Sequence, residues 1–255
     1  MRHDMRYGYR VSFRSSFPNG VKWLLIINVA VFVFQFLLFL TGFEGGLDRF
    51  YRAFGLTPDY VVKSLRVWQL ATYLFIHSFG NPWHILFNML ALWMFGSEIE
   101  QTWGTRRFLK YYFICGIGAG ISVVLIGFLF GAEGVRTIGA SGAIYGLLLA
   151  YGLLFPDRTV FLLIFPIKAK YLVMIMGALA FYFSITGGNS GVSNVAHLGG
   201  LVIGWAYLRA PTMRLSSRSL RDRYERWKLE RAKRKFQVYL KKHDKSGSDR
   251  KPWVH

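Results

Sequence analysis

The chain has 255 residues, of which 53% are hydrophobic and 18% aromatic, and it carries a formal net charge of +19. With a mean hydropathy of +0.29, it is too apolar for an ordinary soluble domain and is typical of a multi-span membrane protein. Sixteen of the 32 lysines and arginines lie from Arg209 onward, so the charge is concentrated outside the apolar runs. This distribution indicates cytoplasmic flanks and argues against a nucleic-acid partner.

The single cysteine, Cys115, lies within an apolar run, where we interpret it as a packing residue. One cysteine excludes an intrachain disulfide and leaves no cysteine cluster for a metal. We expect neither a metal nor another cofactor.

The N-terminal part of the sequence contains one long apolar run. Residues 1–20 are basic and lack an apolar period, whereas residues 21–43 are mostly apolar. This run is too long for the core of a signal peptide, so it predicts a first spanning helix behind a cytoplasmic segment. Residues 44–69 are mixed, with apolar side chains at helical spacing between Leu47 and Phe54. They indicate an amphipathic helix on the outer leaflet, an external loop packed on the bundle, or both.

Five further apolar runs predict spanning helices, which gives six in total. These runs are 83–98, 108–131, 141–155, 171–186 and 195–208. Trp68 and Tyr73 are expected at the membrane interface, and residues 97–107 are interpreted as a polar turn. Residues 159–167 are expected to lie along the inner face, and 187–191 to form an outer loop. Because six is even, both termini fall on the same, cytoplasmic side.

The predicted architecture is an all-α membrane protein in three parts. A basic cytoplasmic segment over 1–20 precedes a six-helix membrane domain over 21–208, and a basic, helical cytoplasmic tail follows over 209–255. The tail either lies on anionic lipid, where ~1 kcal/mol per basic residue accumulates, or is a solvated and partly disordered segment. No internal repeat is visible in the sequence.

The stretch 137–146 (TIGASGAIYG) interrupts the apolar pattern with small and polar residues. It opens the run 141–155, which as a helix reaches only about 22 Å, against roughly 30 Å for the hydrocarbon core. With the end of this run at the inner membrane face, Ser141 lies well below the outer one. Irregular backbone persists at that depth only where protein buries it or water reaches it. Ser141 is therefore a candidate hydroxyl at the floor of a wet cavity.

Small residues recur every four positions on two of the predicted spans. They are Gly142, Gly146 and Ala150 on the fourth span, and Ala196, Gly200 and Gly204 on the sixth. Such faces let two helix backbones approach closely. Packed together, they would bring Ser141 and His197 side by side, with Tyr145 one turn further along to support the imidazole. Helix packing without any chemistry is the alternative interpretation of the glycines.

A serine and a histidine at this depth indicate a particular chemistry. A serine hydroxyl becomes an effective nucleophile when a base within hydrogen-bond reach takes its proton, and histidine suits that role. Because no Asp or Glu lies in a span at that depth, Ser141 and His197 would form a dyad. His84 and Asn88 share a helix face and, with the first backbone N–H of the fourth span, would form an oxyanion hole. Interhelical hydrogen bonding alone is the alternative for these two residues.

Three motifs, in order and on separate spans, carry a specific resemblance. They are HILFN over 84–88, GASG over 139–142 with Tyr145, and AHLGG over 196–200 with Gly204. In these the chain resembles the rhomboid intramembrane serine proteases, over about residues 20–208. The resemblance implies a six-helix core that cleaves substrate transmembrane segments near their outer end, with Ser141 as nucleophile and His197 as base. It also implies oxyanion donors at His84 and Asn88.

The resemblance extends to the surroundings of the site. It implies supporting roles for Gly139, Gly142, Tyr145, Ala196 and Gly200. The span 171–186 would act as a lateral gate, and the outer loop before the sixth span would cap the site. Rhomboid proteases commonly have Trp-Arg in the first loop, where this chain has Trp68 followed by Gln69. This departure affects the anchoring of the loop and leaves the catalytic positions unchanged.

These observations predict an intramembrane serine endopeptidase that acts on single- or multi-span membrane proteins. We expect it in the inner membrane of a bacterial cell, with cytoplasmic termini and an active site open toward the outer side. One alternative is a catalytically silent rhomboid-like protein that binds or escorts membrane clients. Such a protein would be expected to lack the serine or the histidine, or to obstruct the nucleophile. A small transporter or channel is disfavoured by the absence of repeats and of deep acidic residues.

Overall fold

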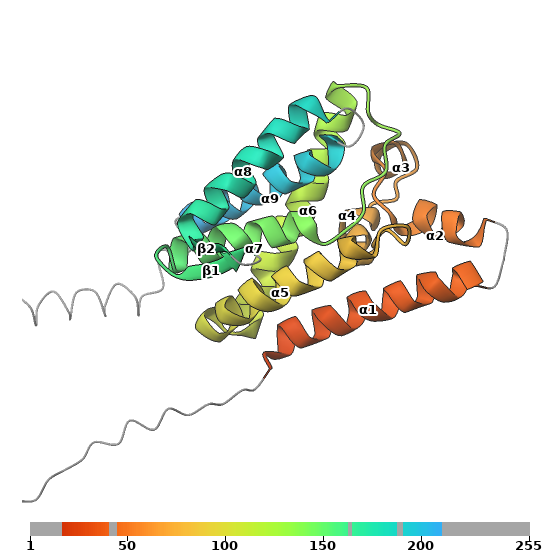
Figure 1. Cartoon of the computed structure of the whole chain (residues 1–255). Helices are drawn as coiled ribbons and strands as arrows, with labels where there is room; N and C mark the ends of the chain where they lie inside the picture. Colours follow the sequence, from red (N-terminus) through yellow and green to blue (C-terminus); the bar gives the residue numbers. More distant parts are fainter. Residues whose placement is uncertain (1–16, 41–44, 163–164, 188–190, 211–255) are drawn as a thin grey trace, which may run out of the picture. The chain divides into compact units, whose positions relative to one another are not determined.

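The computed structural model describes residues 17–40, 45–162, 165–187 and 191–210 (Figure 1). The chain divides into two compact units, Met1–Ala206 and Tyr207–His255. The predicted N-terminal segment up to residue 16 and the basic tail from 211 onward lie outside the described residues. The same holds for residues 41–43 at the end of the first predicted span and for 188–190 of the predicted outer loop.

The described residues are mainly helical, and a helix lies over most of each predicted apolar run. The elements in chain order are α1 (Asn19–Leu40), α2 (Gly46–Phe54), α3 (Pro58–Lys63), α4 (Gln69–Thr72), a 3₁₀ turn (Tyr73–Phe75), α5 (Pro82–Trp103), α6 (Thr105–Leu129), α7 (Ser141–Leu154), β1 (Thr159–Leu162), β2 (Phe165–Lys168), α8 (Ala169–Thr186) and α9 (Gly191–Arg209). Three of the described helices, α1, α6 and α8, are long and apolar enough to cross a membrane. The shorter apolar helix α7 has 14 residues, as the sequence led us to expect.

Helix α7 lies at the centre of the bundle, where it packs against α5, α6 and α8 (Figure 1). The face of α6 that contacts α7 contains glycine, alanine and cysteine residues. Among them, Cys115 and Ala119 are fully buried next to α7. Small side chains at the contact allow the helix axes to approach closely, which apolar packing in a bilayer requires. The burial of Cys115 agrees with its interpretation as a packing residue.

The polar turn that we predicted over 97–107 is wrong for most of its length. Helix α5 continues to Trp103, and the chain breaks only at Gly104, which has a φ of +80°. The reason is Glu100, which is 3% exposed and accepts hydrogen bonds from the backbone N–H groups of Gly20 and Val21, each at 2.8 Å. This carboxylate accepts hydrogen bonds from N–H groups that have no partner within the first turn of α1. Its negative charge also interacts favourably with the positive N-terminal end of the helix dipole.

The all-α prediction also misses a β-hairpin on the segment 159–168. Strands β1 and β2 pair antiparallel, with Thr159 opposite Lys168. Asp157 lies just before the hairpin and forms ion pairs with Lys170 at 2.8 Å and with Lys168 at 3.6 Å. The hydrogen bond from Lys170 lowers the pKa of the Asp157 carboxyl.

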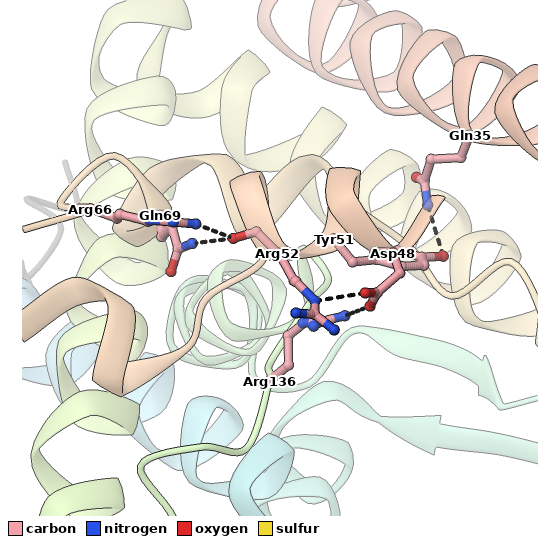
Figure 2. Close-up of polar contacts among 7 residues, drawn as sticks. All are labelled: Gln35, Asp48, Tyr51, Arg52, Arg66, Gln69 and Arg136. Atoms are coloured by element: carbon pink, nitrogen blue, oxygen red, sulfur yellow. Dashed lines mark hydrogen bonds and ion pairs between the residues drawn. The ribbon is translucent and has the colours of Figure 1, made fainter. Parts of the chain in front are cut away.

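Polar contacts fasten α2 to other parts of the chain (Figure 2). Asp48 pairs with Arg52 at 2.6 Å and with Arg136, from the segment before α7, at 3.4 Å. The carbonyl oxygen of Arg52 accepts hydrogen bonds from Gln69 at 2.9 Å and from Arg66 at 3.0 Å. The predicted amphipathic helix is thus present, and it is held to the bundle by side chains that reach its backbone.

Gln69 stands where the resemblance noted in the sequence implies an arginine, and it anchors the first loop. Its side chain is fully buried. The amide oxygen accepts the backbone N–H of Thr57 at 3.1 Å, while the amide nitrogen donates to Arg52. A neutral amide here supplies both a donor and an acceptor to the loop, so no buried charge is needed at this position.

Candidate active site

The side chains of Ser141 and His197 meet inside the bundle. Ser141 is the first residue of α7 and His197 lies in α9, and the serine Oγ is 2.8 Å from the histidine Nε2. The ring of Tyr145, one turn further along α7, stacks on the imidazole with ring centroids 4.2 Å apart and planes inclined by 2°. A nucleophile-type hydroxyl and a base are therefore within hydrogen-bond reach, and an aromatic face fixes the plane of the base.

Backbone contacts between the small-residue faces make this approach possible. A Cβ added at Gly200 would collide with the carbonyl oxygen of Gly142, and one added at Gly204 would lie 3.3 Å from the Cα of Gly146. A Cβ added at Gly142 would also lie 3.3 Å from the carbonyl oxygen of Ala196. Helices α7 and α9 thus touch along their backbones, as the spacing of the small residues predicts.

His84 lies close to the turn that precedes Ser141. The backbone N–H of Ser78 donates to its Nδ1 at 3.3 Å, so in a neutral ring the proton is assigned to Nε2. A Cβ added at Gly139 would lie 2.7 Å from this Nε2 and 3.9 Å from the serine Oγ. Gly139 has a φ of +116°, a backbone conformation that residues other than glycine rarely adopt. Glycine therefore permits both the backbone turn before α7 and the close approach of the His84 N–H.

Asn88 lies one turn along α5 from His84 and is 6% exposed. Its Nδ2 donates to the carbonyl oxygen of His84 at 2.6 Å, which uses one of its two N–H groups within its own helix. The second N–H is the group that could donate a hydrogen bond to an oxyanion as it forms. The first backbone N–H groups of α7, beginning at Ser141, also lack partners within the helix.

The described residues provide no acidic partner for the histidine. The Nδ1 of His197 is buried without a hydrogen-bond partner among them. Within the same residues, no group of three or more His, Cys, Asp or Glu side chains is arranged to hold a metal ion. The arrangement is a serine and a histidine held by packing.

Two further ring side chains, those of Tyr73 and His77, lie buried next to the site. Tyr73, expected at the interface, is fully buried and its hydroxyl donates to the carbonyl oxygen of Gly116 at 2.7 Å. His77 is also fully buried, with its ring centroid 5.1 Å from that of His84. Burial lowers the pKa of His77 to about 3, so its ring is neutral near pH 7. In the sequence, only the closeness of Tyr73 and His77 to the HILFN motif indicates that they lie near the site.

The fold and the site together define a helical membrane protein that brings a serine and a histidine into contact within the bundle. The Rhomboid domain family matches residues 64–211. Rhomboid protease GluP from Bacillus subtilis is 33% identical over 193 residues, which are 74% of this chain and 35% of GluP. The yeast Rhomboid protein 1, mitochondrial, is 30% identical over 76% of this chain and 54% of its own length. Rhomboid protease GlpG from Yersinia pestis is 26% identical over 78% of this chain and 65% of its own length.

The chain therefore belongs to the rhomboid family, and it is a multi-pass integral membrane protein. It spans between about a third and two thirds of the length of these relatives. Two of the three are named as proteases.

Proposed function

We propose that this protein is an intramembrane serine endopeptidase that cleaves transmembrane segments of membrane proteins near their outer end. The observation that carries the proposal is the 2.8 Å separation between the Ser141 Oγ and the His197 Nε2. Membership of a family that includes proteases supports the same conclusion. A silent relative would not need a nucleophile and a base in hydrogen-bond contact.

The first chemical step forms an acyl-enzyme. The Ser141 Oγ attacks the carbonyl carbon of the scissile bond while its proton passes to the Nε2 of His197. The carbonyl oxygen becomes an oxyanion, which accepts hydrogen bonds from the His84 Nε2–H, from the amide of Asn88 and from the N–H groups at the start of α7. The intermediate then collapses: the C–N bond breaks, and His197 returns the proton to the leaving amine.

The second step releases the acyl group. Water attacks the ester carbon, His197 takes a proton from it, and the tetrahedral intermediate expels the serine alkoxide, which recovers that proton. The stacked ring of Tyr145 supports this sequence because it holds the imidazole in one plane throughout. With no acceptor on the His197 Nδ1 among the described residues, orientation by packing takes the place of a third catalytic residue.

We further propose six spans for the membrane domain over 21–208, namely α1, α5, α6, α7, α8 and α9. This count leaves both termini in the cytoplasm and opens the site toward the outer side, in a bacterial inner membrane. Helix α8 serves as the lateral gate for substrates, the loop before α9 caps the site, and the basic tail from 209 onward stays cytoplasmic. The positive-inside distribution of lysine and arginine supports this topology.

The nucleophile can be tested without knowledge of the substrate. The purified protein is treated with a fluorophosphonate probe, and the modified residue is identified by peptide mass spectrometry beside Ser141→Ala and His197→Ala. The proposal expects adduct on Ser141 of the wild type and very slow labelling of His197→Ala. An unlabelled wild type, or adduct at another serine, would favour the silent relative that binds membrane clients.

A further inference from the structure

Gln35 is a fully buried amide in the C-terminal half of the apolar helix α1, and its contacts lie outside that helix. Polar residues at such positions are costly in a bilayer and by default mark function. The amide nitrogen of Gln35 donates to the Tyr51 hydroxyl at 3.0 Å and to the carbonyl oxygen of His77 at 2.8 Å. Its amide oxygen accepts the backbone N–H of His77 at 3.4 Å. Figure 2 shows Gln35 of α1 directed at Tyr51 of α2.

Tyr51 completes the hold on the same segment. Its hydroxyl donates to the carbonyl oxygen of His77 at 3.3 Å and accepts the backbone N–H of Phe79 at 3.2 Å. Together with the bond from Gln35, these contacts use the one donor and both acceptor sites of a phenol hydroxyl. The backbone is therefore fixed at the residues immediately before and immediately after Ser78.

The N–H of Ser78 is the group left between these two fixed points, and it donates to the Nδ1 of His84. That bond decides the tautomer of the imidazole, because a neutral ring with an acceptor at Nδ1 carries its proton at Nε2. The Nε2–H is the donor that faces Gly139 and the start of α7. Donors of this kind act best when they are aimed before the reaction begins.

We propose that Gln35 and Tyr51 are positioning residues for catalysis, which clamp residues 77–79 so that the Ser78 N–H holds His84 in the tautomer that donates to the oxyanion. The inference rests on the proposed protease function, since it concerns the same site. It assigns a function to a polar residue of the first spanning helix, which lies 49 positions before His84 and contributes no atom to the reacting centre.

A purely structural role for a buried amide is represented in the same helix by Asn28. Asn28 is also fully buried, but its Nδ2 donates to the carbonyl oxygen of Leu24, four residues earlier in α1. The substitution Asn28→Leu therefore removes a buried amide of α1 without touching residues 77–79. It is the matched control for Gln35→Met, which keeps the length of the side chain and removes both its donor and its acceptor.

The first measurement is the tautomer of His84, read from the imidazole nitrogen shifts of ¹⁵N-histidine-labelled full-length protein in lipid bilayers. The Ser141→Ala background is used so that turnover plays no part, and His84→Gln identifies the signals. We expect one tautomer, protonated at Nε2, in this background and with Asn28→Leu. With Gln35→Met or Tyr51→Phe we expect a second population protonated at Nδ1.

The second measurement is cleavage of a single-span substrate in liposomes with Ser141 intact. We expect kcat to fall about tenfold for Gln35→Met and about threefold for Tyr51→Phe, below the ~10²–10³ that loss of a whole oxyanion donor costs. KM should stay within about twofold, because the ground state makes little use of that donor. Asn28→Leu should match the wild type.

The outcomes separate this proposal from the function on which it rests. If the wild type cuts nothing, the proposed function fails, whereas the tautomer measurement still reports on the clamp. If the wild type cuts and Gln35→Met leaves kcat unchanged, the positioning role is wrong. A fall in kcat with an unchanged His84 tautomer would also overturn it, because the residue would then be structural. Tyr51→Phe removes a single oxygen and decides the question should Gln35→Met fail to fold.

Discussion

Adding one methyl group beside the serine should disable the site. Gly142 follows Ser141 directly, and an added Cβ would lie 2.7 Å from the Cβ of Ala119 in α6. Its next neighbours would be the carbonyl oxygen of Ala196 at 3.3 Å and the Tyr73 hydroxyl at 3.4 Å. The substitution Gly142→Ala therefore pushes α7 away from α6 at the turn that carries the serine.

The size of the effect follows from contact distances. Non-bonded carbon atoms rest at roughly 3.5–4.0 Å, so the contact with Ala119 must open by about 1 Å. A displacement of about 1 Å in a reacting group can cost ~10²-fold in rate, and overpacking of a tight core costs about 1–3 kcal/mol of unfolding free energy. We expect Gly142→Ala to lose about a hundredfold in kcat/KM and to unfold at a lower temperature.

The assay is steady-state cleavage of a single-span substrate together with thermal unfolding, both in the same detergent. The second substitution Ala119→Gly removes the obstructing methyl, so the double variant should recover most of the lost activity. Gly177→Ala is the matched control, because its added Cβ meets only the Leu201 Cδ1 at 3.4 Å, and activity should stay within about twofold. Full activity of Gly142→Ala, or no recovery in the double variant, would show that the contact between α7 and α6 does not position Ser141.

Other substitutions test the remaining parts of the site and the fold. His84→Ala should lower kcat by roughly 10²–10³-fold with little change in KM. Asn88→Ala should lower kcat by about tenfold, because one of its N–H groups already donates to the carbonyl oxygen of His84. A kcat equal to that of the wild type would show that the substituted residue is not part of the oxyanion hole. Tyr145→Ala should cost about 0.5–1.5 kcal/mol of transition-state stabilisation through loss of the stacked ring, and Tyr145→Phe should be near the wild type. An equal loss in both tyrosine variants would show that the hydroxyl is the important group. Glu100→Gln should lower the free energy of unfolding by about 1–3 kcal/mol in a denaturant titration while kcat is unchanged; an unaltered unfolding curve would contradict its role at the start of α1.

Hydrophobic runs in the sequence locate the helices well. They do not predict where a helix extends beyond its apolar run or where a short apolar run forms a hairpin instead. Each of the six predicted spans falls on a helix, because apolar length is a direct requirement of the bilayer. The extension of α5 past residue 97 depends on a contact between Glu100 and the N-terminus of α1, some 80 residues away in the sequence. The hairpin at 159–168 was missed because a short apolar run is compatible with either a strand or a buried helix.

In the candidate site, too, the sequence predicts contacts that follow from residue spacing along a helix, but not contacts between residues far apart in the chain. The four-residue spacing of small side chains indicates that Ser141 and His197 approach each other, and their side-chain atoms lie 2.8 Å apart. The catalytic roles of these residues, and those of His84 and Asn88, stay predictions. The link from Gln35 to His77 spans 42 positions and has no periodic signature. The sequence shows only that an amide, Gln35, lies within an apolar run.

Cleavage of a single-span protein in liposomes shows whether Ser141 and His197 hydrolyse a peptide bond in the membrane. Purified wild type is compared with Ser141→Ala and His197→Ala, and the products are identified by mass. We expect one cut near the outer end of the substrate's transmembrane segment by the wild type and none by either variant. Cleavage that persists in Ser141→Ala would mean that another nucleophile acts, and the proposed mechanism would be wrong.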